Sequence, residues 1–261
     1  MPFTENNGVR LHWETQGEGT PVLLVMGHRF SGEMWYPVVP ALTPKHQVVW
    51  FDNRGTGQSG STNDATIYDL AADAFAVMDA AGVDSAHIFG VSMGGVIVEE
   101  MAMSKPQRVR SLIVGCSGIL AADVPRSKRY LDVATYIPAR WVINKFRDSM
   151  YGPAAPKDAV DRDIAKLLVE KINPRGVIAQ SKALRTYSTT PEAVARIDKP
   201  TLVLHGTVDT TVPYDKGVEL ANTIPGARLV TFEGAGHNFI VADTELCNKE
   251  LSEFIDSVDH R

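Results

Sequence analysis

The chain has 261 residues, of which 44% are hydrophobic and 22% are charged, a composition typical of globular proteins and not of disordered or fibrous ones. The formal net charge is -5 and no long basic cluster is present, which argues against a nucleic-acid partner. The N-terminus lacks the basic start and apolar core of a signal peptide, and no apolar run approaches membrane-spanning length. We therefore expect a cytoplasmic protein without a membrane partner.

The first elements are predicted by turn and strand signals. Asn7-Gly8 is a tight-turn pair, and the flanking residues 9–15 alternate between apolar and polar, which predicts an antiparallel hairpin at one edge of a sheet. Continuous apolar runs at 22–26 and 47–51 predict strands buried on both faces, as in a parallel sheet. The segment 31–42 between them is expected to form a short helix.

The next elements alternate between helix and strand. Residues 67–81 have helical periodicity, with Asp64 or Thr66 as the candidate cap and Gly82 as the stop. Further strands are predicted at 86–89, 109–114, 200–206 and 228–232, and further helices at 96–103, 216–222 and 245–258. This order indicates an α/β fold with a doubly wound, mostly parallel sheet.

The segment 119–197 has a different character, because tyrosines, prolines and amphipathic helical fragments replace the strand pattern. We interpret it as a helical cap inserted into the core. The predicted domains are therefore an α/β core, formed by residues 1–118 and 198–261, and a cap formed by residues 119–197.

The stretch Gly90-Val91-Ser92-Met93-Gly94 connects a predicted strand to a predicted helix. A serine on so sharp a turn has a strained backbone, so the residues two before and two after it must lack bulk, and both are glycine. The turn would lift Ser92 above the sheet, and the helix N-terminus would direct the backbone N–H of Met93 at charge developing beside it. A glycine-rich turn with an incidental serine is the alternative that this pattern alone leaves open.

A serine hydroxyl is a poor nucleophile unless a base removes its proton, and an imidazole base needs a carboxylate to fix its tautomer. Asp209 follows the strand that ends at Gly206, and His237 lies in a glycine turn after the last strand. Ser92, Asp209 and His237 are thus the candidate catalytic residues. Individually, Asp209 could cap a helix and His237 could be a satisfied polar residue.

Four motifs together resemble the α/β-hydrolase fold family, and the chain is similar to its single-domain serine esterases and lactonases with a helical cap. The resemblance covers residues 9–117 and 197–254. The motifs are Gly90-Val91-Ser92-Met93-Gly94-Gly95, Asp52-Asn53-Arg54-Gly55-Thr56-Gly57-Gln58-Ser59, Leu204-His205-Gly206-Thr207-Val208-Asp209 and Gly236-His237. The resemblance implies Ser92 as the nucleophile, Asp209 as the acid and His237 as the base, which agrees with the choice made from the residues.

One motif departs from the family pattern, because Met26-Gly27 stands where the family usually has His-Gly after its third strand. The resemblance makes the backbone N–H of His28 the second oxyanion donor beside that of Met93, and a backbone donor does not depend on side-chain identity. The His28 side chain could point into the pocket, away from it or toward Arg29.

The remaining candidates are assigned structural roles. Asp52 with Arg54 resembles a structural turn of the family, and an acid role for Asp52 is the alternative. His205 is expected to be a packed core residue. Cys116 and Cys247 are too few for a disulfide framework and lack ligand-like spacing with histidine, so we expect both to be buried small apolar residues.

The favoured hypothesis is hydrolysis of a small-molecule carboxylic ester or lactone through an acyl-enzyme, with no cofactor and no metal. Alternatives with the same triad are an acyltransferase, a perhydrolase and a carbon–carbon bond hydrolase; a non-catalytic ligand-binding protein is a further alternative. Carbon–carbon hydrolases of this fold resemble one another in a tryptophan after the catalytic histidine, where this chain has Asn238. The sequence leaves open the substrate and the oligomeric state, a homodimer included.

Overall fold

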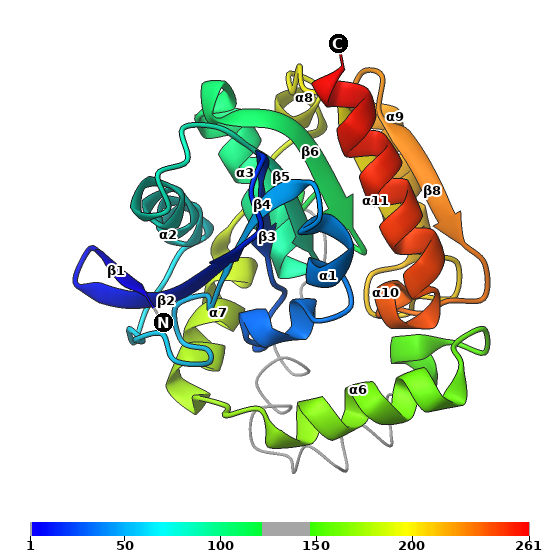
Figure 1. Ribbon diagram of the computed structural model, residues 1–261, viewed down its shortest axis with the longest axis horizontal. Coiled ribbons are helices and arrows are strands. Elements are labelled where there is room, and N and C mark those ends of the chain that lie inside the picture. Colours follow the sequence, from blue (N-terminus) through cyan, green and yellow to red (C-terminus); the bar gives the residue numbers. More distant parts are fainter. Residues whose placement is uncertain (1, 122–146, 261) are drawn as a thin grey trace.

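The computed structural model describes residues 2–121 and 147–260, so expectations that fall on 122–146 lie outside the described residues. An eight-stranded sheet in the order β1-β2-β4-β3-β5-β6-β7-β8 forms its centre (Figure 1). The strands are β1 (Phe3–Asn6), β2 (Val9–Gln16), β3 (Thr20–Val25), β4 (His46–Phe51), β5 (Ala86–Val91), β6 (Val109–Gly115), β7 (Thr201–Gly206) and β8 (Arg228–Phe232). The neighbouring strands from β4 to β8 pair in parallel, which confirms the predicted fold class.

The predicted hairpin is confirmed at one edge of the sheet. Asn7 and Gly8 join β1 to β2 with φ values of 49° and 75°, and two consecutive positive φ values are what a two-residue type I′ turn requires. Strand β2 pairs antiparallel with both β1 and β4, whereas β1 pairs with β2 alone among the described strands.

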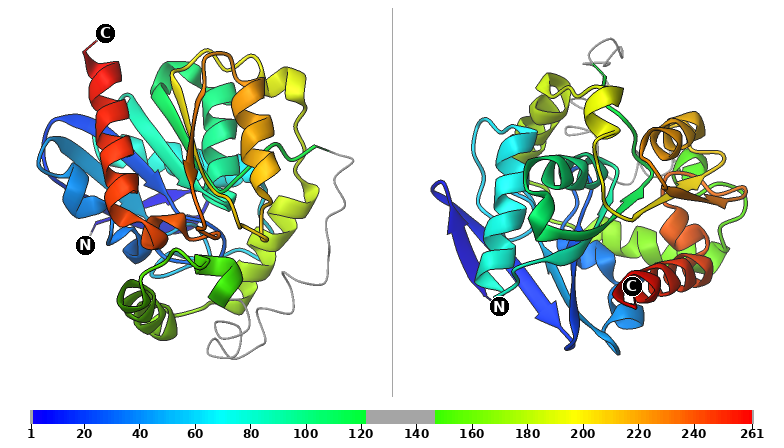
Figure 2. Two further views of the ribbon diagram at one scale, coloured as in Figure 1. Left: turned by 90° about the vertical axis from the view of Figure 1, so that its right-hand side faces the viewer. Right: turned by 90° about the horizontal axis from the view of Figure 1, so that it is seen from above.

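The central strands bury both of their faces, as the continuous apolar runs predict. In β3, Leu23 and Val25 point into one apolar core, and Val22 and Leu24 point into the other. The first core lies under α2 (Ile67–Ala80), α3 (Met93–Ser104) and α9 (Tyr214–Thr223), and the second lies under α1 (Val39–Leu42), α10 (Phe239–Ala242) and α11 (Thr244–Asp259). Figure 2 shows the helices on the two sides of the sheet.

The prediction of one continuous helix over 31–42 is wrong. Two short helices form instead, the 3-10 helix η1 (Gly32–Trp35) and α1. Pro37 lies between them, and a proline has no N–H to donate to a continuous helix. Trp35 is fully buried, as predicted, with its ring 4.9 Å from that of Phe89.

Helix α2 begins at the second of its two candidate caps. The Thr66 side chain accepts a hydrogen bond from the Asp69 N–H at 3.1 Å, and the Asp69 carboxylate accepts one from the Thr66 N–H at 2.9 Å. This reciprocal capping box satisfies N–H groups that a helix start leaves unpaired. Gly82 follows the helix with a φ of 70°, as expected for a stop residue.

Helices α6 (Lys157–Val169), α7 (Pro174–Thr186) and α8 (Pro191–Val194) come between β6 and β7, and we call the described residues 147–197 the inserted segment. Helix α6 lies beyond the carboxyl ends of the parallel strands (Figure 1). No helix in the described part of the chain is both long and apolar enough to cross a membrane.

Helix α7 lies directly on the loop that follows β4. A Cβ atom added to Gly55 would collide with the Gly176 backbone, and one added to Gly176 would collide with the Gly55 backbone. Gln180, fully buried on α7, donates a hydrogen bond to the Arg54 carbonyl oxygen at 2.9 Å and accepts one from the Arg29 N–H at 2.9 Å. The inserted segment is thereby fixed to two loops at the carboxyl edge of the sheet.

We predict that Gly55→Ala lowers the free energy of unfolding by about 1–3 kcal/mol more than Gly82→Ala does, because only the first substitution adds an overpacking cost. Both glycines have positive φ values, 88° and 70°, but nothing lies within 4 Å of a Cβ atom at Gly82. The measurement is urea unfolding of both variants. Equal losses would show that the close approach of Gly176 imposes no overpacking cost on a Cβ atom at position 55.

Candidate functional site

Ser92 occupies the turn between β5 and α3 with φ 55° and ψ -120°, in a region that non-glycine residues rarely adopt. A Cβ atom on Gly90 would collide with the backbone of Gly94, and a Cβ atom on Gly94 would collide with the carbonyl oxygen of Val25. The strand-turn-helix crossing is therefore so tight that both flanking positions require glycine. The predicted geometry of the turn is present in the structure.

The turn after β3 lies against this serine. A Cβ atom at Gly27 would be 3.3 Å from the Cβ and 3.9 Å from the Oγ of Ser92. His28 follows Gly27, and Met93 opens α3, where the first N–H groups have no acceptor within the helix. Both predicted oxyanion donors thus belong to the two backbone segments that meet at the Ser92 side chain.

Asp209 and His237 come together at the carboxyl ends of β7 and β8. The Nδ1 of His237 donates a hydrogen bond to the Asp209 carboxylate at 2.7 Å, and the Asp209 side chain is fully buried. The other carboxylate oxygen accepts hydrogen bonds from the N–H groups of Thr211 at 2.8 Å and Val212 at 3.0 Å. Burial raises the pKa of Asp209, but hydrogen bonds from His205 and His237 outweigh it and lower the pKa to about 2.

His205 is a neighbour of this carboxylate, a contact that its prediction as a core residue missed. It is fully buried, as expected, and its Nε2 lies 3.4 Å from the Asp209 carboxylate. The same nitrogen is 2.9 Å from the Val212 carbonyl oxygen, which can only accept, so Nε2 carries the proton. The sequence contained one indication of this contact, because His205 lies four residues before Asp209 at the end of a predicted strand.

Ser92 and His237 are connected through the end of β6. The Ser92 N–H donates to the Gly115 carbonyl oxygen at 2.9 Å, and the next residue, Cys116, lies close enough to His237 to raise the pKa of the imidazole. Within the described residues, the Ser92 hydroxyl and the His237 imidazole share no hydrogen bond. Both cysteines are buried, as predicted, but nothing in the sequence indicated that Cys116 contacts His237.

The protonation of His237 is set by burial and by its two partners. Burial lowers its pKa, whereas the contacts with Cys116 and Asp209 raise it, and the net pKa lies well above the usual value. The Asp209 carboxylate is a persistent source of this shift, because its own low pKa keeps it charged near neutral pH.

The loop that carries His237 is bound along its backbone by the inserted segment. The His237 N–H donates to the Ser149 carbonyl oxygen at 3.1 Å, and the Gly236 N–H donates to the Tyr151 carbonyl oxygen at 3.0 Å. The position of the imidazole therefore depends on residues far earlier in the chain.

Asp163 of α6 strengthens this connection. Its carboxylate is fully buried and accepts hydrogen bonds from the Tyr36 hydroxyl at 2.9 Å, the Tyr151 hydroxyl at 2.7 Å and the Asn238 amide at 3.0 Å. Burial raises the pKa of Asp163, although these donors act in the opposite direction. One carboxylate thus joins the residue after His237 to α6 and to the loop near η1.

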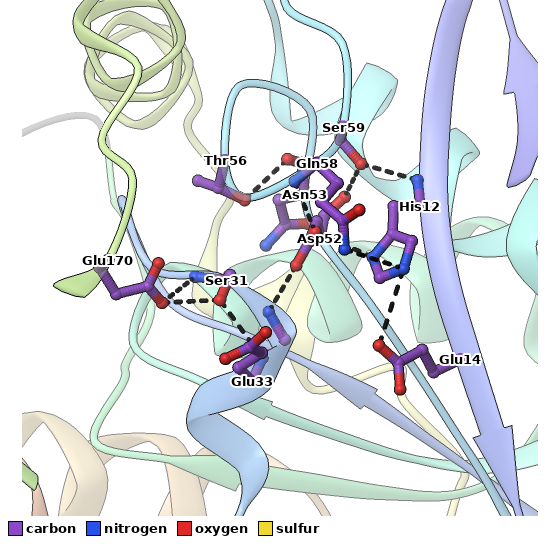
Figure 3. Close-up of polar contacts among 11 residues, drawn as sticks. His12, Glu14, Ser31, Glu33, Asp52, Asn53, Thr56, Gln58, Ser59 and Glu170 are labelled. Carbon is purple, nitrogen blue, oxygen red and sulfur yellow. Dashed lines mark hydrogen bonds and ion pairs between the residues drawn. The ribbon is translucent and has the colours of Figure 1, made fainter. Parts of the chain in front are cut away.

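Asp52, the alternative acid, has its carboxylate in contact with His12 and with backbone N–H groups (Figure 3). Its carboxylate lies 3.0 Å from His12 Nδ1 and accepts hydrogen bonds from the N–H groups of Gly32 and Gln58, each at 2.8 Å. Ser59 is close by, but its hydroxyl donates to the Asp52 carbonyl oxygen and accepts from the His12 N–H. These contacts hold the turn together and bring no hydroxyl to an imidazole.

The His28 side chain contacts α7. Its Nε2 lies 3.0 Å from the Ser181 hydroxyl and 3.2 Å from the Val177 carbonyl oxygen. The sequence left open whether this side chain points into the pocket, away from it or toward Arg29, and it did not indicate the contact with α7. Among the described residues, no group of three or more His, Cys, Asp or Glu side chains could hold a metal ion.

Comparison with known proteins gives one matching family model, and three similar proteins are described here with it. A family model described as the alpha/beta hydrolase fold matches residues 20–243. The protein named "Putative carbamate hydrolase RutD" from Azorhizobium caulinodans is 28% identical, with 99% of this chain and 100% of that protein covered. A hydrolase structure from Pseudomonas aeruginosa PA01 is 26% identical with a TM-score of 0.85, covering 97% of both chains. Est816, an N-acyl homoserine lactone degrading enzyme, is 25% identical with a TM-score of 0.82, covering 97% of this chain and 100% of its own.

We predict that the His237 imidazole titrates above the ordinary histidine pKa of about 6.5, and that Asp209→Asn lowers this pKa. The Asp209 carboxylate stabilises the imidazolium, and its neutral replacement removes that stabilisation. The measurement is an NMR pH titration of the ring resonances, with His237→Gln for assignment. A wild-type pKa at or below about 6.5 would contradict this account of the site.

Proposed function

Because the chain belongs to the α/β-hydrolase fold family, we propose that it is a serine hydrolase that cleaves a carboxylic ester or a lactone through an acyl-enzyme intermediate. The observation that carries this proposal is the hydrogen bond between Asp209 and His237, formed at the same end of the sheet as the strained Ser92. These are the three side chains that nucleophilic attack by a hydroxyl requires.

In the first half-reaction the Ser92 Oγ attacks the carbonyl carbon while His237 Nε2 takes the hydroxyl proton. This nitrogen can accept the proton when the pH exceeds the His237 pKa, because the neutral ring then keeps its one N–H on Nδ1, where it is donated to Asp209. Binding of substrate would bring the Ser92 hydroxyl and the His237 imidazole into hydrogen-bond contact, since catalytic hydrogen bonds often tighten only in the substrate complex.

The negative charge that develops on the carbonyl oxygen needs donors that are already in place. The N–H groups of His28 and Met93 are proposed for this task, because their two backbone segments meet at Ser92. The intermediate then collapses, and the imidazolium of His237 protonates the leaving alkoxide. The ester of Ser92 that remains is hydrolysed by water, which His237 activates in the same way.

We further propose that residues 119–197 act as a cap that shapes the substrate pocket, with residues 1–118 and 198–261 as the core domain. The contacts from 147–197 to the His237 loop and to the turn after β3 support this role. In this account Asp163 is a positioning residue, because it holds Asn238 and therefore the backbone beside the base.

The names of the similar proteins support attack on an acyl carbonyl and differ in the bond that is cut. Est816 is named for lactone degradation, which favours the lactone branch of the proposal. The RutD relative is named for a carbamate, whose carbonyl can be attacked by the same serine. Carbamate hydrolysis is therefore the second candidate function. Each proposed reaction uses water together with the side chains and backbone donors named above.

We predict turnover of short-acyl nitrophenyl esters or lactones, no turnover of a vinylogous diketone, and a loss of roughly 10⁴-fold or more in Ser92→Ala. The measurement compares kcat/KM for an ester, a lactone, a nitrophenyl carbamate and the diketone in one preparation. Ser92→Ala serves as the blank because alanine still fits the turn. Faster cleavage of the diketone would overturn the ester proposal, and faster cleavage of the carbamate would favour the second candidate.

A further inference from the structure

Arg29 carries a positive charge for which the described chain provides no partner. Its guanidinium makes no hydrogen bond or ion pair with a described residue, and its Nε is buried without an acceptor. The guanidinium lies near the Phe30 ring, whose centroid is 5.4 Å away. Burial lowers the pKa of Arg29, and the negative charge of Glu170 only partly opposes this effect.

The acidic group that acts on Arg29 is already engaged. The Glu170 carboxylate accepts hydrogen bonds from the Ser31 N–H at 3.0 Å and from the Ser31 hydroxyl at 2.6 Å (Figure 3). Burial also raises the pKa of Glu170, which weakens it as a counter-charge. Arg54, in the loop after β4, differs from Arg29 in having a partner. Its Nε and Nη2 donate hydrogen bonds to the Asp73 carboxylate at 2.5 Å and 2.6 Å.

The fold does not use the Arg29 side chain to shape the turn. The backbone has a φ of 73°, a conformation that an L residue with a long side chain rarely adopts. The Arg29 N–H is held by Gln180 at 2.9 Å, so the backbone contact fixes this conformation without the guanidinium. A side chain that is costly at this position and unpaired within the protein indicates a role toward a ligand.

Arg29 also belongs to the turn that adjoins Ser92. It is two residues after Gly27, which lies against Ser92, and directly after His28, the proposed oxyanion donor. On its other side it contacts the inserted segment through Gln180, so it lies where the core and α7 meet. A substrate group that extends from the scissile carbonyl along the turn after β3 would meet Arg29.

We propose that Arg29 binds a carboxylate on the substrate, so that the natural substrate is an ester or lactone that also carries an anionic carboxylate. This inference rests on the proposed function, because it assumes that Ser92 marks the scissile bond. A guanidinium offers a planar pair of donors that matches a carboxylate, and such an anion would replace the water that Arg29 has lost on burial.

The first test compares kcat/KM for the monophenyl ester of adipic acid with that for phenyl hexanoate, in the wild type, Arg29→Gln and Arg29→Lys. The ratio of anionic to neutral ester cancels effects that are common to both substrates. We expect the ratio to fall about tenfold to a hundredfold in Arg29→Gln and to fall less in Arg29→Lys, which keeps the charge without the planar donor pair. Arg162→Gln, which removes an exposed arginine of α6, is the matched control and should leave the ratio unchanged. An unchanged ratio in Arg29→Gln would overturn the inference and leave the proposed hydrolase activity standing.

The second test measures binding without turnover. Adipate and neutral 1,6-hexanediol are titrated calorimetrically into the wild type and Arg29→Gln, with Arg162→Gln again as the control. We expect adipate to bind the wild type about tenfold or more tightly than it binds Arg29→Gln, with no such difference for the diol. Equal adipate affinities would overturn the inference. If neither ester is cleaved but adipate binding depends on Arg29, the proposed function fails and the anion site remains.

Discussion

The strained backbone of Ser92 is the constraint on which the rest of the site depends. A φ of 55° at a non-glycine residue costs on the order of 1–3 kcal/mol, and it persists only where the surroundings enforce it. Here the crossing of β5, β3 and α3 enforces it, because Gly90 and Gly94 touch neighbouring backbone directly. The same crossing brings Gly27 to the serine, so one packing arrangement places the proposed nucleophile and both proposed oxyanion donors.

The proposed base is positioned in a different way, through contacts between distant parts of the chain. The backbone beside His237 is bound by Ser149 and Tyr151, and Asp163 holds Asn238. The inserted segment therefore supports the acid–base side of the site, whereas the sheet supports the nucleophile side. A change in α6 could accordingly alter the imidazole position as well as the pocket shape.

Local patterns in the sequence predicted the strands, most helices, the turn at Ser92 and the pair Asp209 and His237. They succeeded because periodicity and glycine spacing act over a few residues, and because Asp209 and His237 each follow a strand end. The break in the helix at 31–42 was missed, although Pro37 was visible as its cause. The contacts of Cys116 and Asp163, and the unpaired charge of Arg29, depend on residues far apart in sequence and could not be inferred from local spacing.

The central claim is that the hydroxyl of Ser92 becomes covalently acylated. Reaction with a fluorophosphonate, followed by digestion and tandem mass spectrometry, locates the modified residue directly. The account predicts one adduct per chain on Ser92, formed more slowly in Asp209→Asn, because the base then loses the carboxylate that fixes its tautomer. Labelling at another residue, or an unchanged rate in Asp209→Asn, would contradict it.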